Sequence, residues 1–556
     1  MVVLDTSLKE LNKYLKRNLT KKQLDEALFN IGMELESSEG NEIKVEITPD
    51  RPDLLSTQGL ARALRAYLGI HKGLIKYKIK KSGIKINVDK SVDAVRPFTV
   101  AAAVKNLKLD YEKLKEIINF QEKIHNTFAR KRKKVAIGIY PLENIKPPIK
   151  YLAKYPEDIR FIPLDFKKEM TAREILEKHP KGVEFSSLLI EHKKYPIFID
   201  SNNKILSMPP IINAEESGKV TEKTRDVFIE CSGHDLNSLS HVLNLVVTTL
   251  ADMNGEIYTA DIFYGNKKIT TPDLSPEKRE LKVNYVNKIL GLSLKPKDIS
   301  SLLEKMNYGI SSVSKDKLKI LVPKYRVDIW HDVDIIDDIA RAYGINNMKL
   351  SFKPVSSIAE TLPENDFIEK LRESIIGLGF VEAFTFALTS KDDQFRKMNT
   401  KPCPYIELGS TKETTINMVR NWLLPELIKF IVNNRSKPYP QKIFEINDVI
   451  IPDNKEEVKS RNVTKLSCLI AHEKTNFTEI KQTLDYLSQV LNINFNIKEL
   501  KHDSFIHGRY ASILINNKEI GFLGEIHPQV LENFQLAVPV SALELNLEEV
   551  FNYLTI

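Results

Sequence analysis

An internal repeat constrains the fold of this chain more than any other feature of its sequence. Residues 19–70 align without a gap with residues 294–345, at a constant offset of 275 residues. Arg51 of the first copy then matches Arg326 of the second. Each copy has apolar residues at helical spacing, an alternating run, a polar R-x-D loop and a second helical run ending at Gly. We therefore expect two similar folded modules that lie far apart in the sequence.

Length and composition bound the class of protein. A chain of 556 residues is too long for a single hydrophobic core, so we expect about three or four domains. Its 42% hydrophobic and 28% charged residues are typical of a soluble globular protein. The N-terminus lacks a signal-peptide pattern and no apolar run reaches membrane-spanning length, which predicts a cytoplasmic protein. The net charge of +8 permits a polyanionic partner. We expect ordinary buried thiols at Cys231, Cys403 and Cys468.

The rest of the chain reads as a mixed α+β, multidomain protein. Between the repeat copies, strand-like runs such as "KVAIGIY" alternate with helical runs such as "LNSLSHVLNLVVTTLADM". Residues 346–366 read as a linker. After it, alternating strands predict an antiparallel sheet with one face packed on helices. We predict domains at residues 1–84 (first copy), 85–265 (central α+β domain), 270–350 (second copy) and 360–556.

Aspartates gather in the second copy. Asp334, Asp337 and Asp338 are spaced to share one helical face, and Asp328 lies in the preceding loop. One interpretation is solvated carboxylates at a helix N-terminus, where acids are favoured, and Asp332 fits that role. The other is a magnesium site, because this hard cation prefers oxygen ligands. The first copy has Gly59, Arg62 and Ala63 at the three helical positions, so the module itself does not require these acids.

Five segments, in order along the chain, resemble the β subunit of phenylalanyl-tRNA synthetase in its archaeal and eukaryotic cytosolic form. The bacterial form carries an inserted OB-fold domain and a C-terminal anticodon-binding domain, and this chain shows neither. The matching segments are "TPDRPDLLSTQGLARALRAYLG", "KRKKVAIGIYPLENIKPPIKY", "MPPIINAEESGKVTEKTRDVFIECSGHD", "VPKYRVDIWHDVDIIDDIARAYG" and "GEIHPQVLENFQLAVPVSALELNL".

The resemblance implies an enzyme subunit. It predicts phenylalanine–tRNA ligase activity in complex with an α subunit, as a tetramer of two α and two β chains acting on phenylalanine tRNA. ATP is then a substrate of the complex, and Mg²⁺ is bound at a site shared with the α subunit. The family's metal motif maps onto Asp328, Asp334, Asp337 and Asp338.

In this family the central domain hydrolyses tyrosine wrongly attached to phenylalanine tRNA. Such editing is needed because a pocket built for phenylalanine cannot strongly reject an isostere that merely adds a hydroxyl. The resemblance implies that Glu230 recognises the phenolic hydroxyl and that the other editing positions surround it. The implied editing residues are Glu230, Ser207, Ser232, Pro209, Asn213 and Glu215. The basic run at residues 129–134 is either a solvated loop or a contact for tRNA phosphates.

The last domain resembles a class II synthetase catalytic domain without its chemistry. The strand "KIFEINDVI" contains no arginine, and a bound triphosphate needs cationic side chains. We expect a non-catalytic domain used for assembly, in which Arg420, Arg435 and Arg509 are structural or interfacial. Two alternatives remain open: a stand-alone RNA-binding or trans-editing protein, and a regulatory nucleic-acid-binding protein, which the acidic second copy disfavours.

Overall fold

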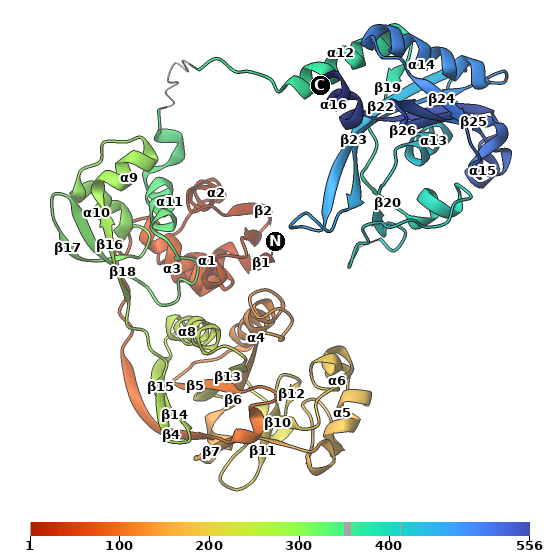
Figure 1. The fold of residues 1–556 in the computed structure, drawn as a ribbon. Coiled ribbons are helices and arrows are strands. Elements are labelled where there is room, and N and C mark those ends of the chain that lie inside the picture. The colour runs from red at the N-terminus through yellow and green to blue at the C-terminus, as the bar shows by residue number, and fades with distance from the viewer. Residues whose placement is uncertain (1, 350–356, 412, 556) are drawn as a thin grey trace. The chain divides into compact units, whose positions relative to one another are not determined.

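The computed structural model describes residues 2–349, 357–411 and 413–555. The chain divides into two compact bodies, residues 1–352 and 353–556, which are described separately (Figure 1). The predicted mixed α+β multidomain class is confirmed, with several separate sheets. The finer division into four domains stays a prediction, and part of the predicted linker, residues 350–356, lies outside the described residues. No helix in the described ranges is long and apolar enough to cross a membrane.

Both copies of the repeat have the same element order and the same sheet order. The first is β1 (Val2–Ser7), α1 (Leu8–Leu15), α2 (Lys21–Asn30), β2 (Glu34–Glu39), β3 (Glu42–Ile47) and α3 (Thr57–Tyr67). The second is β16 (Glu277–Lys282), α9 (Val283–Leu290), α10 (Pro296–Glu304), β17 (Gly309–Val313), β18 (Lys317–Val322) and α11 (Asp332–Tyr343). The sheet orders are β1-β3-β2 and β16-β18-β17. The structural repeat therefore begins at residues 2 and 277, earlier than the sequence match.

An asparagine fastens the turn between the first two helices of each copy. Asn12 Nδ2 donates to the Leu19 carbonyl at 3.3 Å, and the Leu19 N–H donates back to Asn12 Oδ1 at 3.0 Å. Asn287 and Leu294 make the same two hydrogen bonds at 3.0 and 2.8 Å. Because these bonds satisfy backbone groups just before α2 and α10 begin, they set where each second helix starts.

The two copies contact each other through the turn that follows the second helix. Gly32 (φ +79°) and its counterpart Asn307 (φ +65°) both adopt the left-handed conformation. A Cβ at Gly32 would lie 1.8 Å from Nη1 of Arg341 in α11, and Asn307 Nδ2 donates to the carbonyl of Arg62 in α3 at 3.4 Å. Each turn thus meets the last helix of the other copy. Arg341 Nη1 adds a 3.0 Å hydrogen bond to the Ile31 carbonyl.

A ten-stranded sheet lies between the two copies in sequence. Its order is β12-β11-β10-β7-β4-β14-β5-β13-β6, with β15 added on β14. The strands are β4 (Ile79–Val88), β5 (Phe98–Lys105), β6 (Val135–Pro141), β7 (Ile149–Lys154), β10 (Tyr195–Ile199), β11 (Ile205–Met208), β12 (Ile212–Asn213), β13 (Val227–Gly233), β14 (Glu256–Tyr264) and β15 (Lys267–Thr271). The two ends of the sheet approach each other, since Asn213 Nδ2 in β12 donates to the Ile139 carbonyl in β6 at 3.4 Å.

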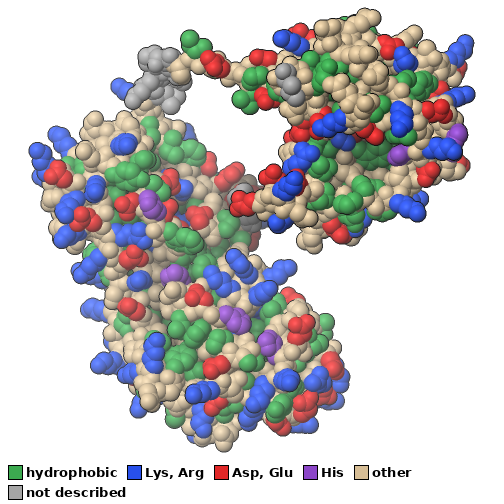
Figure 2. Space-filling model, viewed as in Figure 1, with side chains coloured by type: hydrophobic (Ala, Val, Ile, Leu, Met, Phe, Trp, Pro, Cys, Tyr) green, Lys and Arg blue, Asp and Glu red, His purple; other side chains and the backbone are tan. Residues whose placement is uncertain are grey.

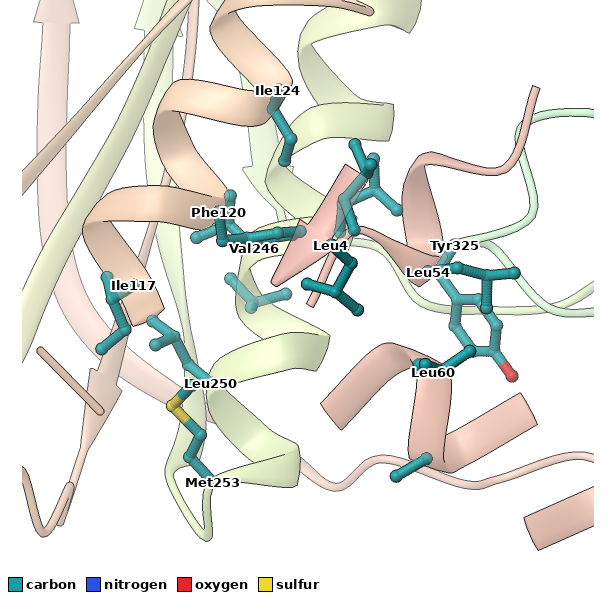
Figure 3. Close-up of a cluster of buried hydrophobic side chains, with 14 of the residues drawn as sticks. Leu4, Leu54, Leu60, Ile117, Phe120, Ile124, Val246, Leu250, Met253 and Tyr325 are labelled. Carbon is teal, nitrogen blue, oxygen red and sulfur yellow. The ribbon is translucent and has the colours of Figure 1, made fainter. Parts of the chain in front are cut away.

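Helices α4 (Tyr111–Asn126) and α8 (Leu236–Asp252) lie between this sheet and the first copy of the repeat (Figure 1). Their buried side chains join one hydrophobic cluster with residues of the first copy and with Tyr325 (Figure 3). The labelled members are Leu4, Leu54, Leu60, Ile117, Phe120, Ile124, Val246, Leu250, Met253 and Tyr325. The first copy and the central sheet therefore share a continuous apolar core, so they are held in a fixed relation.

The second body is built on a seven-stranded sheet with the order β19-β22-β23-β27-β26-β25-β24. Helices cover both faces, and the prediction of a single packed face was wrong. Buried residues alternate along β22 (Gln441–Pro452): Phe444 joins the core under α12 (Pro363–Gly377) and α14 (Phe477–Leu491), while Ile443 joins the core under α13 (Leu424–Asn433). The other strands are β19 (Val381–Glu382), β23 (Ser460–Ala471), β24 (Asn496–Glu499), β25 (Phe505–Ile515), β26 (Lys518–Ile526) and β27 (Val540–Asn546).

The predicted buried thiols are confirmed at Cys231 and Cys468, whereas Cys403 is exposed. On the face drawn in Figure 2, Lys and Arg side chains are interspersed with Asp and Glu over both bodies. On this face the modest positive charge is thus dispersed among acidic side chains.

Candidate functional site

The principal candidate site is a cavity of about 590 Å³ beside β6, between α4 and the segment from β11 to residue 220. It lies where the two ends of the ten-stranded sheet approach each other. Four of the six predicted editing residues line it, namely Ser207, Pro209, Asn213 and Glu230. Apolar side chains of α4 and β6 form much of the remaining wall, including Ile117, Ile118, Ile137 and Ile139. An apolar cavity with a few polar groups is the usual form of a small-ligand site.

Glu230 is a buried acidic residue in the wall of this cavity. Its side chain projects from β13, the strand between β5 and the end strand β6, and the residue is only 2% exposed. One carboxyl oxygen, Oε1, lies 3.0 Å from the Tyr140 hydroxyl, and Oε2 has no hydrogen-bond partner among the described residues. Burial raises the pKa of Glu230 to about 8, against the lowering effects of Tyr140 and of the Arg96 charge. Glu230 is therefore a neutral carboxylic acid at neutral pH.

The Tyr140 hydroxyl lies between Glu230 and Ser207 and contacts both side chains. Its hydroxyl lies 2.7 Å from Ser207 Oγ in β11 and 3.0 Å from Glu230 Oε1 in β13. A phenol has one proton and can donate to only one of them, so the other contact requires a proton from Ser207 or from protonated Glu230. The three groups form a chain of hydrogen bonds that holds Glu230 Oε1, while Oε2 makes no hydrogen bond to a described residue.

The other two predicted editing residues do not line this cavity. Ser232 is buried one pleat further along β13, where its Oγ accepts a hydrogen bond from Arg96 Nε at 3.2 Å. Glu215 lies at the rim and holds two neighbours: its carboxylate accepts from Lys219 Nζ and from the Asp165 N–H, both at 2.7 Å. Ser232 and Glu215 therefore support the site from outside its wall.

A second polar group lies on the α4 side of the cavity. Arg132 Nη2 donates to Glu122 at 2.8 Å, and Nη1 donates to the Ile211 carbonyl at 2.8 Å. Burial opposes ionisation of Glu122, but His125 and Arg132 lower its pKa to about 2. His125 Nε2 accepts a hydrogen bond from the Ile137 N–H at 2.9 Å. Because this nitrogen is occupied, His125 positions β6 and is not free to act as a base.

The basic run at residues 129–134 contains both buried and exposed side chains. Arg130, Lys131 and Arg132 all have positive φ angles, of 51°, 52° and 64°. This left-handed course turns Arg132 inward to the cavity, where it is 8% exposed and lies over the Phe185 ring, while Arg130 and Lys131 remain exposed. From the sequence alone the residues of this run look alike. The backbone conformation distinguishes them, because it buries Arg132 and leaves Arg130 and Lys131 exposed.

The four predicted magnesium ligands line a second cavity, of about 580 Å³. Two of them already have a cation: Arg326 Nη2 lies 2.6 Å from Asp328 and 2.7 Å from Asp338. Burial opposes ionisation of Asp328, but the Arg326 charge lowers its pKa. Asp338 is also hydrogen-bonded to the Tyr308 hydroxyl at 2.6 Å. In the first copy the equivalent pair is Arg51 with Asp53.

The other two aspartates have local partners. Asp334 accepts hydrogen bonds from the N–H groups of Trp330 and His331 at 2.8 and 2.7 Å, which caps α11. Asp337 pairs with Arg341 at 2.8 Å. Within the described ranges there is no group of three or more His, Cys, Asp or Glu side chains placed to hold a metal ion. All four aspartates are thus paired with groups of the described residues, and the predicted ligand set stays a prediction.

Three arginines of the second body were expected to be structural or interfacial. Arg420 is fully buried, with Nη1 2.9 Å from Glu445 and Nε 3.0 Å from the Asp448 carbonyl. Arg509 pairs with Glu525 at 2.6 Å, and Arg435 is exposed. Arg420 is thus held in the core of this body by Glu445 and the Asp448 carbonyl.

Comparison with known proteins decides the family. Curated relatives named phenylalanine–tRNA ligase β subunit are 41% identical over 502 residues in both Pyrococcus abyssi and Pyrococcus furiosus, covering 90% of this chain and 90% of each relative. The chain belongs to the phenylalanine–tRNA ligase β-subunit family. Family models match three separate parts of it: the B1 domain of the Phe-tRNA synthetase β subunit at 1–70, the tRNA synthetase B5 domain at 279–345, and the β-chain CLM domain of phenylalanyl-tRNA synthetase at 351–547.

A solved structure supports the same family assignment for the first body. The crystal structure of an N-terminal fragment of the phenylalanyl-tRNA synthetase β subunit from Pyrococcus horikoshii is 40% identical, with a TM-score of 0.60. It covers 62% of this chain and all of the fragment. The chain is thus one part of a phenylalanine–tRNA ligase, and the comparisons do not favour a stand-alone RNA-binding or trans-editing protein.

Proposed function

We propose that this β subunit acts with an α subunit in the cytoplasm to attach phenylalanine to its tRNA, using ATP, and that its own cavity removes tyrosine from mischarged tRNA. The observation that supports the editing role is the buried, neutral Glu230, which lines a mostly apolar cavity and whose Oε2 has no hydrogen-bond partner among the described residues. A tyrosyl ring fits an apolar wall, and its hydroxyl would supply the missing partner.

Glu230 would discriminate tyrosine from phenylalanine through hydrogen bonding. With tyrosine bound, the phenolic hydroxyl exchanges a hydrogen bond with the protonated carboxyl. With phenylalanine bound, Oε2 is buried against a ring edge, and an unsatisfied buried polar group costs about 1–3 kcal/mol. A site built to hydrogen-bond a substrate hydroxyl rejects the analogue that lacks it far better than an apolar pocket does.

Hydrolysis in this cavity would depend on positioning. Ser207 is engaged with Tyr140, and His125 accepts from the Ile137 N–H, so neither is placed as an activated nucleophile or base. Holding the ester close to a water converts hydrolysis into an effectively intramolecular step. We propose that the water is assisted by the substrate, with the 207–213 segment positioning the ester.

The test is Glu230→Ala in the assembled enzyme, with Glu230→Gln as the matched control. The alanine variant should charge phenylalanine normally and accumulate tyrosyl-tRNA, with deacylation slowed about tenfold or more, because about 1.4 kcal/mol of hydrogen bonding equals a factor of ten. Glutamine keeps a donor and an acceptor and should retain much of the activity. Deacylation of tyrosyl-tRNA at the normal rate by the alanine variant contradicts the role of Glu230.

We also propose that the aspartate surface is a junction with the α subunit, in a tetramer of two α and two β chains, where a magnesium ion is shared. Trp330 is 82% exposed beside this surface, an unusual position for a tryptophan outside an interface. Asp334 and Asp337, whose partners lie on the same segment or helix, are the two carboxylates that a partner could recruit. The set is completed only with groups from the α subunit.

For the second body we propose a non-catalytic class II synthetase-like domain used in assembly. Two apolar side chains are exposed in the segment just after β19. Phe384 is 84% exposed and Phe386 is 85% exposed. Two exposed phenylalanines close together on one segment favour a protein partner over solvent. The burial of Arg420 against Glu445 supports the absence of an ATP site of its own.

A further inference from the structure

A smaller cavity of about 180 Å³ adjoins the candidate editing cavity, and Pro210 belongs to the wall of both. Basic side chains dominate its polar lining: Arg96, Lys133, His192 and His234. The remaining lining residues are Val95, Ser187, Leu188, Leu189 and Pro210, so no acidic residue is among them. Arg96 and the exposed Lys133 carry positive charge here and the two histidines can acquire it, so an anion in this space would be electrostatically stabilised.

Arg96 makes this cavity an unusual one. It is 3% exposed, and within the described ranges no carboxylate lies within ion-pair distance of it. Nε donates to Ser232 Oγ at 3.2 Å, and Nη2 donates to the Ser232 and Arg132 carbonyls at 2.6 and 3.2 Å. Nη1 makes no hydrogen bond to a described residue. A guanidinium stays charged in proteins, and burying it without a counter-charge is costly.

His234 responds to this charge. His234, which directly follows β13, has its pKa lowered by burial and then by the charges of Arg96 and His192. Among the charged and titratable groups facing it across the cavity, Lys133 adds a further positive charge. An anion between these groups would relieve their repulsion, as opposite charges within a few ångströms favour the charged form.

The position of the cavity indicates which anion it fits. The basic loop continues from Arg132, in the wall of the larger cavity, to Lys133, in the wall of the smaller one. The Arg132 carbonyl also binds Arg96, which ties the two walls together. Since one water occupies about 30 Å³ in the liquid, a space of about 180 Å³ holds a phosphate with a few waters and not a whole nucleotide.

We propose that this smaller cavity binds a backbone phosphate of the tRNA acceptor end while the aminoacyl group lies in the larger cavity. The inference deepens the proposed editing function and rests on it. The phosphate is placed by Arg96 Nη1, His234 and Lys133. A bound phosphodiester then fixes the distance between the acceptor strand and Glu230, so only the ester-linked tyrosine reaches the bottom of the larger cavity.

The experiment compares two minimal substrates in the assembled enzyme: the tyrosyl ester of adenosine, which has no phosphate, and the tyrosyl ester of cytidylyl-adenosine, which has one. The wild type should hydrolyse the phosphate-bearing ester with a KM about tenfold lower, because a charged hydrogen bond contributes about 1.5–3 kcal/mol. In the Lys133→Ala, His234→Ala double variant this advantage should disappear, while KM for the adenosine ester changes less than about twofold.

The control is Lys131→Ala, which removes a positive charge from the same loop at a position outside the cavity wall. It should keep the advantage of the phosphate-bearing ester. Arg96→Lys serves as a second variant, which retains the positive charge and lacks the planar set of N–H donors of a guanidinium. It should weaken the advantage if its melting temperature is unchanged.

The outcomes separate the two proposals. Equal KM values for both esters in the wild type overturn the phosphate site and leave editing intact. Hydrolysis of neither ester overturns editing and, with it, this site. Added inorganic phosphate should compete with the cytidylyl-adenosine ester and not with the adenosine ester. Inhibition of both esters alike means that free phosphate binds elsewhere, which contradicts the assignment.

Discussion

Burial of Glu230, which we propose as the recognition group of the cavity, also affects the stability of the fold. Its pKa of about 8, against an ordinary value of 4.5, means that the folded chain holds a proton that the unfolded chain releases. The stability of the fold is therefore greatest below pH 4.5 with respect to this group, and falls as the pH rises toward 8. The carboxyl group of Glu230 is neutral in the folded chain because burial makes its ionised form unfavourable.

This linkage predicts the effect of Glu230→Gln on stability. Glutamine has nearly the same shape and cannot ionise. At pH 7.5 the variant should be more stable than the wild type by on the order of 3 kcal/mol, and at pH 5 the two should be nearly equal. Chemical denaturation of the first body at the two pH values measures this difference. A constant difference across the range would show that Glu230 is ionised in the folded chain.

At the same scale, the sequence gives only part of the site. Glu230, Ser207, Pro209 and Asn213 were predicted through the family resemblance, and the structure brings them to one cavity, where their role stays a proposal. Tyr140 was missed because its partners lie 67 and 90 residues away, and nothing in the strand "VAIGIY" shows where its side chain points.

At the level of elements, the repeat carried the most predictive information. A constant offset over 52 residues constrains both copies to the same helices and strands, and the structure gives them the same sheet order. The leading strand and helix of each copy were not recognised, because β1 and β16 share almost no residues and only their register with β3 and β18 makes them equivalent. Pairing partners are set by long-range contacts that no local pattern reports.

The contact between the copies predicts the effect of Gly32→Ala. Alanine at φ +79° is strained by roughly 1–2 kcal/mol, and its Cβ would also displace the Arg341 guanidinium, which lies 1.8 Å away. The hydrogen bond from Arg341 to Ile31 is then lost. Denaturation of the first body should show a destabilisation of about 3 kcal/mol in total.

Gly40→Ala is the matched control for this prediction. Gly40 has a φ of +57° and nothing within 4 Å of its would-be Cβ, so alanine there reports backbone strain alone. It should destabilise by about half as much as Gly32→Ala. In an Arg341→Ala background the two glycine substitutions should become equal. An excess at Gly32 that persists in that background would mean that Arg341 does not carry the contact.

At the scale of the whole molecule, the aspartate surface predicts how assembly responds to magnesium. Asp334→Ala with Asp337→Ala should weaken binding of a co-purified α subunit by tenfold or more, and a chelator should weaken the wild-type complex similarly. Asp332→Ala is the control, because it lies in the first turn of α11 and outside the cavity wall. The contradicting outcome is binding that is equally tight with and without magnesium, in both the wild type and the double variant. These carboxylates would then serve only in helix capping and ion pairing.

The division of labour between subunits predicts the activity of the complete enzyme. In the second body Arg420 is held by Glu445, and the strand "KIFEINDVI" contains no arginine to bind a triphosphate. Because phosphoryl groups require cationic contacts, this chain alone should not charge tRNA with phenylalanine. Co-expressed with its α subunit, it should support ATP-dependent charging, measured as phenylalanine attached to tRNA. The α subunit alone is the control and should be inactive or much weaker. Charging by the isolated β chain would show that the second body retains a working synthetic site. If neither chain nor the pair charges tRNA, an RNA-binding or trans-editing role would be favoured instead.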